Sequence, residues 1–211
     1  MKSIIGYGSL LSERSARETV PSLENFRIVE VSGYKRVFNK VGVVFFSRHN
    51  ATADSQEIAC CSTLEARNST IICSQFECSD DAYHALYERE HRYDWLEVDT
   101  FHPEEGVSRG FMCTTNTDTA YRKTKCASEQ EYYERVGQYY SGQLWRNDIL
   151  PFPRYLAFCL QAAEGQGAEV LDNFLDSSFL ADGNTSIRAY LKEAPHLENW
   201  REMDTGYSYR R

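Results

Sequence analysis

The chain has 211 residues, of which 42% are hydrophobic and 26% charged, and this length suffices for one ordinary domain with a full hydrophobic core. Its net charge is −8, from 23 Lys plus Arg against 31 Asp plus Glu, and no cluster of basic residues forms a stripe. We therefore expect neither nucleic acid nor an anionic membrane as a partner, whereas a small anionic substrate is compatible with this charge.

The sequence also indicates the cellular compartment in which the protein is expected. The N-terminal run lacks the length and cleavage pattern of a signal peptide, and no segment approaches the ~20 apolar residues of a membrane span. Seven cysteines without a Cys-x-x-Cys pair argue against both a disulfide framework and a structural zinc site. We expect buried thiols in a reducing compartment and a cytoplasmic protein.

A strand-like apolar run opens the chain and stops at two glycines and a serine, in Lys2-Ser3-Ile4-Ile5-Gly6-Tyr7-Gly8-Ser9-Leu10-Leu11. Glycine permits positive φ and lacks a Cβ, so the amides of residues 7–10 can approach a ligand and donate to an anionic group. The run matches neither the phosphate-binding nor the dinucleotide-binding glycine motif. An ordinary turn after a strand is the alternative interpretation.

Short strand-like runs dominate the next part of the chain. After a short helix expected at residues 13–18, alternating apolar residues predict strands at residues 26–31, 35–39, 41–47, 57–64 and 69–77. Such closely spaced strands without intervening helices favour an antiparallel or mixed sheet, closed as a small barrel.

A helix is predicted at residues 79–93, because Ser79 suits the N-cap and two aspartates follow it. At 100° per residue, Glu90 falls within the apolar stripe of this helix, four residues after Leu86, whereas Glu88 falls on the polar side. Glu90 is therefore the carboxylate expected to point inward.

In the last part of the chain, predicted helices replace predicted strands. Strands are expected at residues 95–101 and 108–115, and helices follow at residues 128–145, 155–163, 170–175 with an extension to 180 left open, and 185–194. We predict an α+β fold in which residues 1–125 form the barrel domain and residues 126–211 form a helical extension packed on it.

The glycine loop and Glu90 together suggest acid–base chemistry. Burial among tyrosines disfavours an ionised carboxylate and is expected to raise the pKa of Glu90, unless a cation such as Arg89 offsets that effect. Such a carboxylate can accept a proton and return it. The alternative is a structural Glu90 paired with Arg89 or Arg92.

Three segments resemble the γ-glutamyl cyclotransferase superfamily. Residues 5–10 look like its Tyr-Gly-Ser-Leu substrate loop, and Tyr87-Glu88-Arg89-Glu90 looks like its catalytic segment. Gly33-Tyr34-Lys35-Arg36-Val37-Phe38-Asn39 is similar to a Gly-Tyr-Arg-Arg-x-Phe run common in the family. The likeness covers residues 1 to about 125. The strand at residues 71–76 departs from it, since it lacks the glycine that many members carry.

The resemblance implies a small barrel with the loop and Glu90 on opposite sides of a pocket. It also implies release of 5-oxoproline from a γ-glutamyl amide, with Glu90 as general base and then acid, and without metal or cofactor. The implied substrate-binding residues are Tyr7, Gly8, Ser9, Leu10, Tyr93 and Tyr121. The expected partner is a small γ-glutamyl molecule, and the expected state is a monomer or homodimer.

Two other functions remain open at this point. A cysteine hydrolase would need a thiol activated by a histidine or a helix N-terminus, and no cysteine stands in such a context. A non-catalytic binding or regulatory protein on the same fold is the stronger alternative, because fold alone does not determine function.

Overall fold

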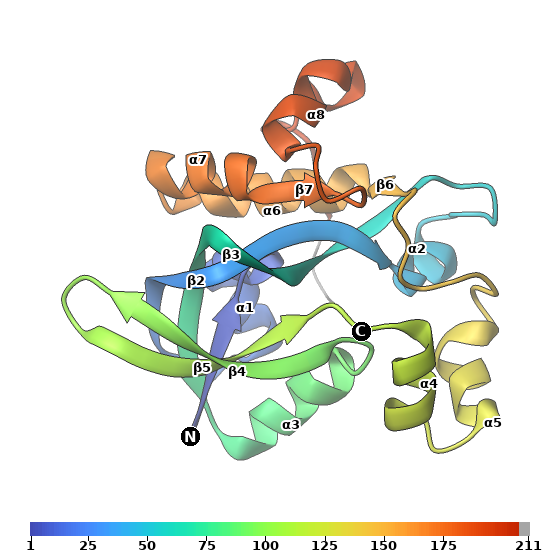
Figure 1. The fold of residues 1–211 in the computed structure, drawn as a ribbon, viewed down its shortest axis with the longest axis horizontal. Coiled ribbons are helices and arrows are strands. Elements are labelled where there is room, and N and C mark those ends of the chain that lie inside the picture. Colours follow the sequence, from blue (N-terminus) through green and yellow to red (C-terminus); the bar gives the residue numbers. More distant parts are fainter. Residues whose placement is uncertain (207–211) are drawn as a thin grey trace.

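The computed structural model describes residues 1–206 and contains a closed five-stranded barrel (Figure 1). The strands of the barrel are β1 (Lys2–Gly6), β2 (Glu24–Val41), β3 (Glu57–Cys78), β4 (Asp94–His102) and β5 (Gly106–Thr114). They pair in the order β3-β1-β5-β4-β2, and a further pairing of β2 with β3 closes the ring. The predicted α+β class with a small mixed barrel is confirmed.

Long antiparallel pairing of β2 with β3 forms the largest part of the barrel wall. The register runs from Glu24↔Glu77 to Val41↔Ala59 and shifts at three places, one of them between Val37 and Lys40. Such irregularities bend strands and suit a barrel of this size. β1 pairs antiparallel with β3 but parallel with β5, which makes the barrel mixed.

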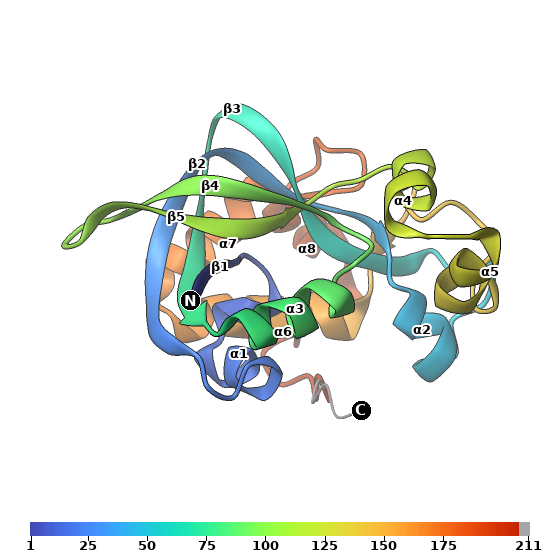
Figure 2. The same ribbon diagram turned by 90° about the horizontal axis from the view of Figure 1, so that it is seen from below.

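Helices surround this barrel on several sides. Figure 1 shows α6 (Pro153–Gly165), α7 (Ala168–Ser177) and α8 (Ile187–Glu193) above the barrel and α3 (Asp80–Arg89) below it. Figure 2 shows α1 (Glu13–Thr19) next to α3. The remaining helical segments are η1 (Ser9–Leu11), α2 (Val43–Arg48), α4 (Asp118–Lys125), α5 (Glu129–Tyr132), η2 (Tyr133–Gly137) and η3 (Pro195–Leu197).

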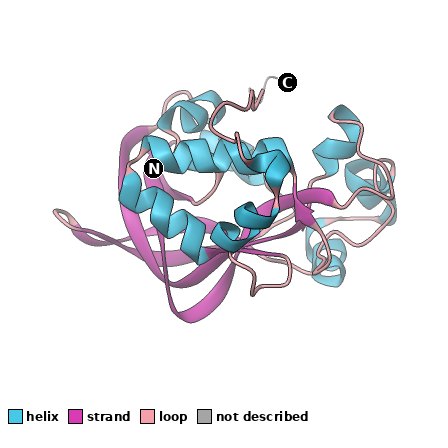
Figure 3. Cartoon of the chain, turned by 90° about the horizontal axis from the view of Figure 1, so that it is seen from above, coloured by secondary structure: helices cyan, strands magenta, loops and turns pink. Residues whose placement is uncertain are grey.

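Two short strands tie the C-terminal part to the barrel. β6 (Leu150–Pro151) pairs parallel with β3, and β7 (Ser178–Leu180) pairs parallel with β2. Seen from above, the helices of this part cover the sheet (Figure 3). The division of the chain at residue 125 stays a prediction.

Two hydrophobic clusters hold these layers together. The larger one joins the barrel interior to α6 and α7 and contains Phe38, Leu156 and Phe174, each 0% exposed. The smaller one packs α1 and α3 on β1 and β3, with Leu86 among its buried members. No helix within the described residues is both long and apolar enough to cross a membrane.

Most of the predicted elements are present, with several corrections. Residues 24–41 form one strand instead of two, and so do residues 57–78. Residues 43–48 form a helix instead of the predicted strand, and residues 178–180 form a strand after α7 ends. The helix at residues 118–125 was not predicted. The helix expected up to residue 145 ends at Gly137, because residues 138–148 form an irregular segment. The helix carrying the candidate carboxylate ends at Arg89, so Glu90 is its C-cap.

Candidate active site

The glycine loop follows β1 directly and is packed too tightly for side chains at its glycines. A Cβ on Gly6 would lie 2.5 Å from Ser74 Oγ and 2.6 Å from Leu10 Cβ, and one on Gly8 would lie 3.1 Å from Tyr155 Oη. Among the described residues neither glycine has a positive φ, so that part of the expectation is wrong. Close approach of neighbouring groups explains both glycines.

Neighbouring elements hold the loop through its carbonyl groups. Ser74 Oγ on β3 donates to the carbonyls of Gly6 at 3.2 Å and Leu10 at 2.7 Å. Gln166 Nε2, just after α6, donates to the Leu11 carbonyl at 3.0 Å. Because the carbonyls are occupied by the scaffold, the loop has a fixed conformation before any ligand binds.

The Tyr7 carbonyl is held by Arg36, a side chain on β2 that is 0% exposed. Arg36 Nε donates to Tyr7 O at 2.7 Å, and the same guanidinium bonds the Ile72 carbonyl and, at 2.9 Å, Ser177 Oγ on α7. All these acceptors are neutral. The guanidinium therefore connects the loop, β3 and the C-terminal part at a single buried point.

Glu90 follows the last residue of α3 and has one carboxylate oxygen fixed. Nε and Nη2 of Arg89 each lie 2.8 Å from Glu90 Oε1, and Arg89 Nη1 donates to Thr19 Oγ1 at 2.6 Å. Within residues 1–206 no hydrogen bond is made by Glu90 Oε2. The side chain as a whole is 26% exposed.

The charge state of Glu90 differs from the sequence-based expectation. Burial raises the pKa of Glu90, but Arg89, Lys40 and Arg92 together outweigh burial and hold the pKa below its ordinary value. The expected rise is therefore wrong, and the stated exception, a nearby cation, applies. At neutral pH Glu90 is ionised, which is the state that accepts a proton.

Tyr7 and Tyr93 lie in the electrostatic surroundings of Glu90. Both side chains are buried, and burial is the largest cause that raises the pKa of each phenol, with Glu90 as a further cause. Tyr93 Oη donates to the Cys61 carbonyl at 3.0 Å. The structure thus brings the loop residue Tyr7, Tyr93 and Glu90 into one cluster.

Lys40 belongs to the same cluster and was not identified from the sequence. Its Nζ lies 4.7 Å from the centroid of the Tyr93 ring, and the residue is only 6% exposed. Glu90 is among the groups that influence its pKa, which burial lowers. Alternation along β2 indicates a side chain inside the barrel, but a lysine in a strand carries no sequence signal for a site.

Tyr121, the last of the predicted site residues, points elsewhere. It is fully buried on α4, and its hydroxyl lies 3.1 Å from Nδ1 of His91, the residue after Glu90. Burial, followed by a hydrogen bond with Cys126, raises the pKa of Tyr121. Its hydroxyl is occupied by these partners, and its role toward a substrate stays a prediction.

Six of the seven thiols have a pKa shifted away from that of a nucleophile. All seven cysteines are free, and burial raises the pKa of six of them: Cys60, Cys61, Cys73, Cys78, Cys113 and Cys159. This shift is opposite to the one a cysteine nucleophile needs. No group of three His, Cys, Asp or Glu within the described part of the chain is arranged to hold a metal ion.

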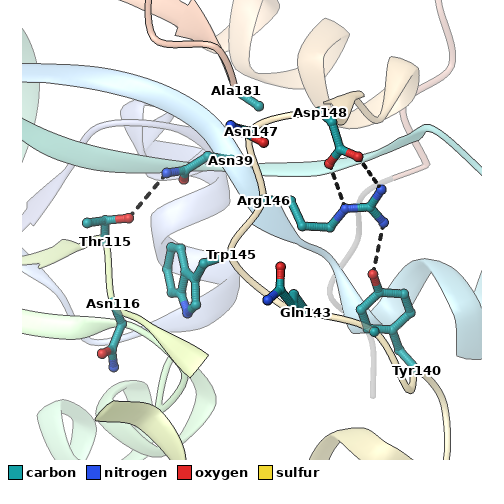
Figure 4. A pocket seen from close by; sticks show the side chains of 11 residues that line it. Asn39, Thr115, Asn116, Tyr140, Gln143, Trp145, Arg146, Asn147, Asp148 and Ala181 are labelled. Carbon is teal, nitrogen blue, oxygen red and sulfur yellow. Dashed lines mark hydrogen bonds and ion pairs between the residues drawn. The ribbon is translucent and has the colours of Figure 1, made fainter. Parts of the chain in front are cut away.

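A cavity of about 570 Å³ lies beside this cluster, lined by Asn39 on β2 and by loop residues that include Asn116, Gln143 and Arg146 (Figure 4). Trp145 forms part of its wall and meets the Tyr93 ring edge-on, with ring centroids 5.6 Å apart. Glu90 and the glycine loop do not line it. The cavity is therefore a neighbour of the candidate site.

The closed barrel, the fixed glycine loop and the Glu90 carboxylate held by Arg89 define an α+β protein with one candidate acid–base site. Comparison with solved structures finds γ-glutamyl cyclotransferases among the matches. One structure named gamma-glutamyl cyclotransferase is 16% identical, with coverage of 68% of this chain and 94% of that chain and a TM-score of 0.41.

Two further structures extend this comparison. A yeast γ-glutamyl cyclotransferase specific to glutathione is 11% identical, over 82% of this chain and 94% of its own, with a TM-score of 0.44. YkqA from Bacillus subtilis is 12% identical, over 93% of this chain and 54% of its own, with a TM-score of 0.46. All three TM-scores lie below 0.5, so the likeness carries no argument about the fold or the reaction. No family model matches the sequence, and no match is found among curated proteins.

Proposed function

We propose that this protein is a γ-glutamyl cyclotransferase-type enzyme, which releases 5-oxoproline and a free amine from a γ-glutamyl amide. The observation that carries the proposal is the geometry of Glu90, with Oε1 fixed by Arg89 and Oε2 without a hydrogen bond among residues 1–206. A positioned and ionised carboxylate with one oxygen left without a hydrogen bond is suited to act as a general base.

In the proposed reaction, Glu90 takes one proton from the α-ammonium group of the substrate. The resulting amine attacks the γ-carbonyl carbon of the same molecule, and a five-membered lactam closes as the amide C–N bond breaks. Of the three ammonium protons, one stays on the ring nitrogen and two end on the departing amine, with Glu90 as the relay. Because the attack is intramolecular, orientation of the bound chain supplies much of the rate.

The loop of Tyr7, Gly8, Ser9 and Leu10 is proposed to hold the glutamyl part. Its carbonyls are already bound by Ser74, Arg36 and Gln166, so it needs little reordering on binding. Backbone N–H groups of such a loop are suited to the oxyanion that develops on the γ-carbonyl. Tyr93 is proposed to close the side of the site next to Lys40.

The experiment is a substrate panel with γ-Glu-Ala, glutathione and ε-(γ-glutamyl)-lysine, in which 5-oxoproline and free amine are both quantified. We expect equal amounts of the two products from at least one member. The control is the same substrate with an acetylated α-amine, which cannot cyclise and should yield neither product. Release of free glutamate instead of 5-oxoproline would contradict the proposal.

A non-catalytic binding protein is the second candidate, and the Arg89–Glu90 ion pair favours it, because such pairs also occur as purely structural features. This candidate predicts that γ-glutamyl compounds bind without turnover. The same panel, measured by calorimetry as well as by product release, distinguishes the two functions.

A further inference from the structure

Lys40 is buried, yet it has no polar partner in the part of the chain that the structure describes. It is 6% exposed, no carboxylate oxygen of residues 1–206 lies within 4.0 Å of its Nζ, and it makes no hydrogen bond to these residues. Its close contact is the face of the Tyr93 ring at 4.7 Å. Lys40 Nζ is not among the side-chain atoms of residues 1–206 that are shut off from solvent without a partner, so the ammonium at the end of this mostly buried side chain is free to bind an anionic group.

The surroundings of Lys40 indicate what would satisfy it. Glu90 is too far from Lys40 for an ion pair within 4.0 Å, yet near enough that each charge acts on the other. Tyr93 links the two residues in space, because its ring lies against Lys40 Nζ and its backbone N–H donates to the Glu90 carbonyl at 3.0 Å. Cys60, which is partly exposed, lies opposite Lys40 in the pairing of β2 with β3.

We propose that Lys40 binds the α-carboxylate of the ligand while Glu90 Oε2 faces the adjacent α-nitrogen. An α-amino acid carries an ammonium and a carboxylate on one carbon, and this pair of charges complements Glu90 and Lys40. The cation–π contact with Tyr93 holds the ammonium in place before the ligand arrives. This inference rests on the proposed function, because it names the group by which that site recognises its substrate.

The test uses two ligands that differ only in the carboxylate. 5-Oxoproline carries it, whereas 2-pyrrolidinone is the same lactam without it, and neither is turned over. Binding of each is measured by calorimetry to the wild-type protein, to Lys40→Met, and to the exposed control Lys192→Met. A charge-assisted hydrogen bond corresponds to about 10- to 100-fold in affinity, so we expect wild type to prefer 5-oxoproline by at least about 10-fold.

We expect Lys40→Met to lose this preference and Lys192→Met to keep it. Thermal unfolding checks that each variant is folded, and Lys40→Gln replaces Lys40→Met if the latter is not. A wild-type protein that binds the two ligands equally, or binds neither, overturns the inference. So does a folded Lys40 variant that retains the preference.

Kinetics separate this inference from the proposed function. If γ-Glu-Ala is turned over, Lys40→Met should raise KM by about 10-fold or more, with a smaller change in kcat. A loss confined to kcat, with the ligand preference intact, would overturn the carboxylate role. If no substrate is turned over but the carboxylate preference depends on Lys40, the enzymatic proposal fails and the assignment of Lys40 stands.

Discussion

Two buried cations on the same strand, Arg36 and Lys40, have opposite surroundings. Arg36 is 0% exposed and bonds the loop, β3 and α7 through neutral acceptors. Lys40 is 6% exposed and has an aromatic face beside it but no hydrogen-bond acceptor within the described chain. Both pKa values are lowered, and burial is the largest cause in each case.

This difference distinguishes a buried charged residue that supports the fold from one that is available to bind a ligand. A buried charge that is fully bonded by the protein contributes to the fold, whereas one left open is costly until a ligand completes it. The Arg36 end of the barrel, covered by α6 and α7, is therefore the scaffold of the glycine loop. The Lys40 end, beside Glu90 and Tyr93, is the candidate site.

The largest effect on stability is expected for Arg36→Met. This change leaves the carbonyls of Tyr7 and Ile72 and the side chain of Ser177 without their donor in a buried region. Each buried unsatisfied group costs about 1–3 kcal/mol, so we expect a loss of roughly 3 kcal/mol or more in the free energy of unfolding. Urea denaturation measures it, with the exposed Arg67→Met as control. A decrease of less than about 1 kcal/mol in the free energy of unfolding would show that Arg36 does not hold the glycine loop, β3 and α7 together.

Gly6→Ala should cost somewhat less and should also disturb the site. The new methyl group meets Ser74 Oγ and Leu10 Cβ, and overpacking of this kind costs about 1–3 kcal/mol. Gly165→Ala is the matched control, since no atom lies within 4 Å of its added Cβ. Denaturation and turnover of γ-Glu-Ala are measured together. Equal results for the two variants would mean that the loop is not held as tightly as its contacts indicate.

The His91 neighbourhood predicts a pH dependence of stability. Burial, followed by the charge of Arg92, lowers the pKa of His91 from 6.5 to about 3. Between these pH values the unfolded chain binds a proton that the folded chain does not, so stability falls as the pH falls. The slope is at most about 1.4 kcal/mol per pH unit. His91→Gln should flatten it, whereas His84→Gln, an exposed histidine, should leave it unchanged.

The smallest effect, and one of opposite sign, is expected for Lys40→Met. Replacement of a buried unpaired charge by a flexible apolar side chain should stabilise the protein by about 1 kcal/mol in the absence of ligand. Thermal unfolding without ligand measures this change against wild type. A marked destabilisation would indicate that Lys40 serves the fold in the way that Arg36 does.

The sequence predicted the barrel and a tight loop after the first strand, because alternation and paired glycines are local signatures. The role of Glu90, inferred from helical periodicity, stays a prediction. The sequence did not predict residues 43–48 as a helix, because this apolar run has the composition of a strand. The lowered pKa of Glu90 depends on Lys40, which is distant in the chain, and on the orientation of Arg89. Such pairings come from tertiary packing, and no local pattern in one sequence records them.

The most direct test of the account compares 5-oxoproline release from γ-Glu-Ala by wild type, Glu90→Gln and Glu88→Gln. Glu88 is two residues away on α3, 64% exposed, and pairs with Arg135 at 3.2 Å. The account predicts that Glu90→Gln loses at least the ~10²-fold expected of a positioned acid and base, while Glu88→Gln stays within a few-fold of wild type. Turnover by Glu90→Gln equal to that of Glu88→Gln would contradict the account and make Glu90 a structural partner of Arg89.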